Sequence, residues 1–155
     1  MFIHWESRLE TGHPLVDAEH RLLVLLFRKL DVAIKTHQPD DVLRHIVREV
    51  VRCVEFHFQS EENLMRETAY PGLQGHQALH AELLIELNAY VARIAVRREF
   101  PEDLLSFLSL WLSQHIAEHD QRVVRHVATS ALRPVAEQAY AEYLGGAQAL
   151  KSPPP

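Results

Sequence analysis

Short groups of helix-breaking residues divide this chain into long segments and constrain its fold more than any other feature. These groups are Gly12 to Pro14, Gln38 to Asp41, Tyr70 to Gly72 and Phe100 to Asp103. Proline ends or starts a helix because it lacks the backbone N–H, and acids are favoured in a first helical turn. Between the breaks, apolar residues recur every three or four positions, which is the spacing of one helical face.

The four segments between the breaks predict four long helices. We expect them from Pro14 to about Thr36, from about Asp41 to Glu67, from Leu73 to Arg97, and from Asp103 to about Leu132. No segment alternates apolar and polar residues as a half-buried strand does. Long helices with short connections predict an all-α fold, an antiparallel up-down four-helix bundle.

The C-terminal part of the chain has a different residue pattern from the four segments. Pro134 interrupts the last pattern, and residues 135–144 predict a short fifth helix that ends at Gly145-Gly146. From Ala147 to the closing Ser-Pro-Pro-Pro we expect a disordered tail. The predicted organisation is therefore a bundle over residues 1–132 and a C-terminal extension over residues 133–155.

Charge, hydropathy and cysteine usage exclude several classes of function. The formal net charge of −5 is opposite to that of a nucleic-acid-binding protein, so we expect no nucleic-acid partner. The apolar run from Leu22 to Phe27 is too short to cross a membrane. With one cysteine, Cys53, and no secretion signal at the N-terminus, the sequence favours a cytoplasmic protein.

Histidine is the unusual component, with 11 residues. Each of the four predicted helices carries at least one candidate histidine. In three of the helices a second histidine or a carboxylate follows four or five residues later. The candidate ligands, in chain order, are His20, His57, Glu61, His76, His80, His115 and Asp120.

The spacing of these residues predicts a metal site in the bundle core. Residues four apart lie on one helical face, so His57 and Glu61 point the same way, as do His76 and His80. One such pair alone is commonly two solvated residues. A set distributed over four helices faces the core, where an unpaired polar group is costly. Imidazole and carboxylate together suit iron.

The fourth segment leaves two ligand choices open. In a regular α-helix, His119 lies closer to the direction of His115 than Asp120 does. Spacing alone therefore nominates His115 and His119. A π-bulge, which inserts one extra residue, would instead bring Asp120 inward.

The motifs resemble those of the hemerythrin family, and in particular its bacterial members. They run from Trp5 through Asp17-x-x-His20, His57-Phe58-x-x-Glu61-Glu62, Tyr70-Pro71 and His76-x-x-x-His80 to Trp111-Leu112-x-x-His115-Ile116-x-x-x-Asp120. The resemblance implies two non-haem iron ions with an oxo or hydroxo bridge, and O2 as the ligand.

The same resemblance implies a role for each candidate residue. His76, His80 and His115 would bind one iron, and His20 and His57 the other, which keeps an open position. Glu61 and Asp120 would bridge the two ions. The apolar pocket over the open position would be lined by Leu23, Phe58, Leu112 and Ile116.

Several residues fall outside this pattern. We expect Glu62 to be solvated and Cys53 to be a small buried side chain. Asp17 is equally compatible with two roles: an acid in the first turn of the helix, or a residue that orients a metal ligand. The remaining histidines are expected at the surface: His4, His13, His37, His45 and His126.

Three functions are compatible with such a site. The first is reversible O2 binding by a carrier, store or sensor. The second is a di-iron enzyme, namely a peroxidase, NO reductase or oxidase; oxidase-type bundles use paired Glu-x-x-His motifs, which the second and third segments lack. The third is an iron store or an iron-responsive module, in which metal occupancy controls folding. The sequence favours the first and identifies no protein partner.

Overall fold

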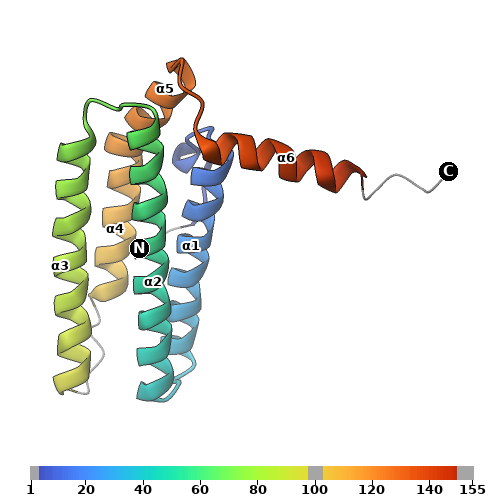
Figure 1. Ribbon diagram of the computed structural model, residues 1–155. Coiled ribbons are helices and arrows are strands. Elements are labelled where there is room, and N and C mark those ends of the chain that lie inside the picture. Colours follow the sequence, from blue (N-terminus) through green and yellow to red (C-terminus); the bar gives the residue numbers. More distant parts are fainter. Residues whose placement is uncertain (1–3, 98–102, 150–155) are drawn as a thin grey trace.

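The computed structural model describes residues 4–97 and 103–149, and the described residues are helical with no strand. The long helices stand side by side as a bundle (Figure 1). Their bounds, with two short helical turns, are η1 (Ser7–Leu9), α1 (Pro14–Lys35), α2 (Asp40–Glu67), α3 (Leu73–Arg97), α4 (Leu104–His115), the π-helical turn η2 (Ile116–Asp120), α5 (Gln121–Thr129) and α6 (Val135–Ala149). None of the helices in these ranges is long and apolar enough to cross a membrane.

The predicted four-helix bundle is confirmed, with one change in its fourth helix. The bounds of α1, α2 and α3 agree with the predicted ones to within a residue or two at each end. The fourth helix is not one continuous α-helix to Leu132. It consists of α4, the π-turn η2 and α5, and it ends at Thr129.

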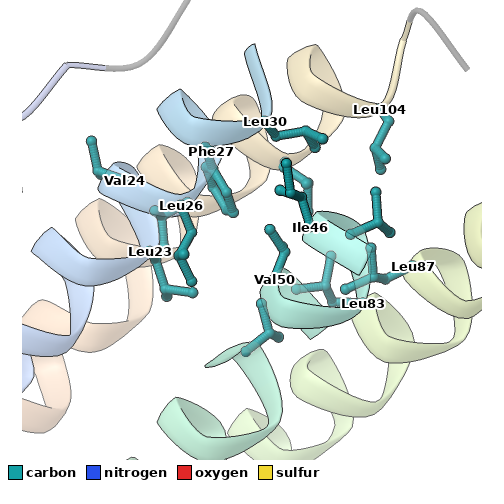
Figure 2. Close-up of a cluster of buried hydrophobic side chains, with 14 of the residues drawn as sticks. Leu23, Val24, Leu26, Phe27, Leu30, Ile46, Val50, Leu83, Leu87 and Leu104 are labelled. Atoms are coloured by element: carbon teal, nitrogen blue, oxygen red, sulfur yellow. The ribbon is translucent and has the colours of Figure 1, made fainter. Parts of the chain in front are cut away.

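Apolar side chains form two clusters at different heights in the bundle. The larger cluster joins α1, α2, α3 and α4, and its side chains point into the space between these helices (Figure 2). The smaller cluster includes Val16, Met65 and Val127. Along α1, His20 falls between Val16 of the smaller cluster and Leu23 of the larger one. The candidate ligands therefore occupy a polar layer between two apolar layers.

His13, which precedes α1, is buried, so the expectation that it lies at the surface is wrong. Its Nδ1 accepts a hydrogen bond from the backbone N–H of Val16 (3.4 Å), so the imidazole caps the helix. Asp17 accepts bonds from the backbone N–H groups of Thr11 (2.8 Å) and Gly12 (3.1 Å). Gly12 has a φ of 90°, which favours glycine. Asp17 thus orders the turn before α1.

The C-terminal helix α6 is longer than predicted, because Gly145-Gly146 does not end it and the helix continues to Ala149. The predicted disorder from Ala147 is therefore wrong for residues 147–149, and the rest of that segment lies outside the described residues. Figure 1 shows α6 leaving one end of the bundle and projecting sideways, away from the other helices. Its first backbone N–H, at Val135, donates to Glu67 Oε2 (2.8 Å).

We expect the larger cluster to dominate the stability of the bundle. Leu87 of α3 is fully buried in this cluster. The substitution Leu87→Ala should lower the free energy of unfolding by about 2–5 kcal/mol, because it removes buried methyl groups and leaves a cavity. Chemical denaturation measures the change. Leu25→Ala is the matched control, since Leu25 is 62% exposed and should change the stability little. Equal effects at the two positions would contradict this description of the core.

Candidate metal centre

The seven candidate ligands, which come from five elements, are brought together in the polar layer. They form two adjoining groups, and within each group one potential ligand atom per residue lies within 4.8 Å of every other. The first group is Glu61, His76, His80 and His115, and the second is His20, His57 and Asp120. All seven side chains are buried.

The first group gathers around one oxygen of Glu61. Oε2 of this residue lies 3.0 Å from His76 Nε2 and 3.3 Å from His80 Nε2. The Nε2 atom of His115 lies 3.0 Å from that of His76. Three imidazole nitrogens from α3 and α4 therefore converge with a carboxylate oxygen of α2. This is the composition of a site for a transition metal ion such as iron.

Asp120 stands between the two groups and contacts both. Its Oδ1 lies 3.1 Å from His115 Nε2 and 3.4 Å from His76 Nε2, which belong to the first group. Its Oδ2 lies 3.2 Å from Nε2 of His20 in the second group. One carboxylate with an oxygen toward each group is the arrangement needed to bridge two cations.

The site passes a test of fit for metal, because its buried polar atoms lack partners. Among the described residues, most of the buried side-chain nitrogen and oxygen atoms without a hydrogen-bond partner belong to this cluster: His20 Nδ1 and Nε2, His57 Nε2, Glu61 Oε1, His80 Nε2 and both oxygens of Asp120. Several of them approach another polar atom without hydrogen-bond geometry. Such orphaned atoms are costly unless a cation accepts their lone pairs.

The π-turn η2 explains why the site contains Asp120 and not His119. A π-turn adds one residue, so the residue five positions after His115 returns to the face that His115 occupies. Asp120 is fully buried, whereas the side chain of His119 is 31% exposed. Spacing along a regular helix would have exchanged these two residues.

Electrostatics keeps both carboxylates ionised. Burial alone would raise the pKa of Asp120, but the neighbouring imidazoles of His115 and His20 hold it well below its usual value. For Glu61, burial and the charge of Asp120 also act to raise the pKa. The hydrogen-bonding imidazoles of His76 and His80 outweigh them and lower it. Two anionic carboxylates in a dry layer attract cations strongly.

Two glutamates that the ligand pattern did not select hold the rings of two site histidines. His57 Nδ1–H donates to Glu19 Oε2 (2.9 Å), and Glu19 also accepts from the hydroxyl of Ser60 (2.6 Å). His80 Nδ1–H donates to Glu62 Oε1 (3.1 Å), so the expectation that Glu62 is solvated is wrong. A carboxylate on Nδ1 fixes the tautomer and leaves Nε2 free to bind metal.

Apolar and aromatic side chains close one side of the centre. Leu23, Phe58, Leu112 and Ile116, the predicted pocket residues, are all buried in the larger cluster. The ring of Phe58 stacks on His80 with centroids 3.7 Å apart. Trp111, which was not a predicted pocket residue, stacks on His115 at 4.4 Å. These rings restrict the movement of the imidazoles.

The lone cysteine lies beside this layer, one turn before His57. Cys53 is half-buried against the larger cluster, so it is more exposed than predicted. Burial, with the charges of Glu19 and Glu49, raises the pKa of its thiol to about 11. At neutral pH the thiol is protonated and therefore a weak nucleophile and a weak metal ligand.

Comparison with known proteins identifies the family of this fold and site. Residues 11–127 match the family model "Hemerythrin HHE cation binding domain". The bacteriohemerythrin of Stenotrophomonas maltophilia is 30% identical over 117 residues, 76% of each chain. That of Pseudomonas aeruginosa is 25% identical over 136 residues, 86% of this chain and 88% of the relative. A crystal structure of wild-type hemerythrin superposes with a TM-score of 0.75 at 20% identity, covering 83% of this chain and all of that one. The chain belongs to the hemerythrin family.

Proposed function

We propose that this protein binds O2 reversibly at a pair of non-haem iron ions joined by an oxo or hydroxo bridge. In this proposal, His76, His80 and His115 hold one ion, and His20 and His57 hold the other. Glu61 and Asp120 bridge them, as the position of Asp120 between the two groups favours. When bound, the iron pair supplies the redox chemistry and the position at which O2 is taken up.

The asymmetry of the two groups supports this assignment most directly. Three histidines converge on one side and only two on the other, so equal coordination numbers would leave a free position beside His20 and His57. A centre with five imidazoles and two carboxylates is richer in histidine than the Glu-x-x-His sites of oxidase-type bundles. That composition favours binding of O2 over its activation.

The chain itself contributes geometry and the exclusion of water. Glu19 and Glu62 orient His57 and His80 through their Nδ1 atoms, so both rings present Nε2 to the centre. Leu112 and Ile116 are buried in the larger cluster beside this layer, and the seven candidate ligands are themselves buried from solvent. We place the protein in the cytoplasm, where reducing conditions suit its single thiol.

An absorption spectrum tests the proposed function. The iron-loaded protein is reduced without air, exposed to O2 and then returned to an atmosphere without O2. We expect a visible band that appears with O2 and disappears on its removal, with two irons per chain by metal analysis. A steady consumption of O2 or peroxide in place of a reversible band would indicate an enzyme. One zinc per chain in iron-replete protein would contradict the iron assignment.

Substitutions in the π-turn test whether Asp120 or His119 is the metal ligand that follows His115. Asp120→Ala should lose iron or lose the spectrum of a bridged pair, because it removes a carboxylate that contacts both groups. His119→Ala is the neighbouring control and should retain nearly normal iron content. Iron content per chain and the absorption spectrum measure both effects. Loss of iron in the His119 variant alone would mean that the histidine is the ligand.

Leu112 tests whether the apolar side of the centre protects bound O2. Leu112→Ala should open a cavity, admit water and speed the irreversible loss of the O2-dependent band, with the iron content retained. The substitution should also cost about 2–5 kcal/mol of stability, so unfolding is measured alongside. Leu110→Ala on the same helix is the control, since Leu110 is 59% exposed. Equal lifetimes of the band in the Leu112 variant and the parent would make Leu112 an ordinary core residue.

A further inference from the structure

A groove between α2 and α3 has no role in the metal centre. It has a volume of about 300 Å³. Its lining comes from residues 44–55 of α2 and residues 88–95 of α3: Arg44, Val47, Arg48, Val51, Arg52, Glu55, Asn88, Val91, Ile94 and Ala95. This places it toward the end of the bundle opposite the one from which α6 leaves (Figure 1).

The groove combines an apolar floor with a row of arginines along one side. Arg44, Arg48 and Arg52 are spaced four residues apart, so they lie on one face of α2. Arg52 pairs with Glu55 at 3.4 Å. Arg44 and Arg48 have no ion-pair partner within the described part of the chain. In a chain with a net charge of −5, this is a local positive site that suits an acidic, partly apolar occupant.

Helix α6 has the complementary chemistry and is not packed along its length. It contains Glu137 and Glu142 and no basic residue. At about 100° per residue, its larger apolar residues, which are Val135, Tyr140, Tyr143 and Leu144, fall on one half of the helix, and the two glutamates border that half on either side. Tyr143 is 70% exposed and Leu144 is 44% exposed. A helix with this face lowers its free energy by placing it against an apolar surface.

We propose that the arginine-lined groove of one chain binds α6 of a second copy. Within one chain, α6 is held at the opposite end of the bundle. Its first N–H is bound to Glu67 (2.8 Å), and Glu137 lies 3.7 Å from His13. It leaves this end of the bundle sideways (Figure 1), whereas its own groove lies toward the other end. When two bundles pair antiparallel, the α6 end of one lies beside the groove end of the other, and the exchange can be reciprocal.

The contact has one apolar and one ionic part. Tyr143 and Leu144 would fill the floor formed by Val47, Val51 and Val91, and Glu142 would face Arg48 at the rim. Glu142 is the acid free for this role, because Glu137 already lies near His13 and Arg133. Since the ionic part is exposed to solvent, higher salt should weaken the association.

Sedimentation velocity of the iron-loaded full chain tests this proposal over a range of protein concentrations. We expect a concentration-dependent dimer whose dissociation constant rises with ionic strength. Arg48→Glu and Glu142→Arg should each raise that constant by about fivefold or more. Tyr143→Ala with Leu144→Ala should abolish the dimer. Arg48 on α2 and the three α6 residues are all exposed, so each variant should keep its iron content and, at concentrations where the parent is monomeric, its melting temperature.

Two further variants separate this contact from general charge effects. Arg122→Glu on α5 changes the charge equally outside the groove and should leave the dissociation constant unchanged. The double variant Arg48→Glu with Glu142→Arg reverses the pair and should restore dimerisation toward the parent value. A chain that stays monomeric at every concentration, a dimer that survives truncation before Pro134, or the absence of rescue in the double variant would each overturn the proposal. None of these readouts depends on O2 binding.

Discussion

The structure depends on one constraint, which is that a dry layer of the bundle contains five imidazoles and two ionised carboxylates. Several of their buried nitrogen and oxygen atoms have no hydrogen-bond partner among the described residues, and unpaired polar groups of this kind are costly in a protein interior. Metal ions bound by one nitrogen of each imidazole and by the carboxylate oxygens satisfy most of them at once. Iron binding therefore contributes free energy to the folding of this chain as well as serving its function, because the unfolded chain has no preformed site.

The polar layer also explains how the rest of the bundle is divided. Apolar packing is concentrated in a larger cluster on one side of the layer and a smaller one, with Val16 and Met65, on the other. The helices pass through the layer, the fourth of them by way of the π-turn η2, and bring the candidate ligands to one height. Glu19 and Glu62 add cross-links between neighbouring helices at that height, because each binds a histidine of another helix.

Sequence reasoning predicted the helices, and most of the candidate ligands that the structure brings together, because both depend on local spacing. Asp120 is the exception, since spacing alone nominated His119 and only the resemblance to the family pointed to Asp120. It failed where a residue's role depends on its neighbours in space. Glu19 meets His57 only through the register of α1 against α2, and His13 is buried because it caps a helix whose end is covered. The end predicted at Gly145-Gly146 was wrong because glycine weakens a helix by about 1 kcal/mol without forbidding it.

The extra residue in η2 has a consequence beyond Asp120. Apolar residues of α4 such as Leu108 and Leu112 define the side that faces the core. If α4 continued as a regular α-helix, Val123, Val124 and Val127 would lie about 90° around the helix from the side that faces the core. The extra residue of the π-turn rotates these valines back by about 100°. The carboxylate of Asp120 and the valines of the smaller cluster are thus turned toward the core by the same inserted residue. A one-residue deletion in this turn would therefore rotate both Asp120 and these valines away from the core together.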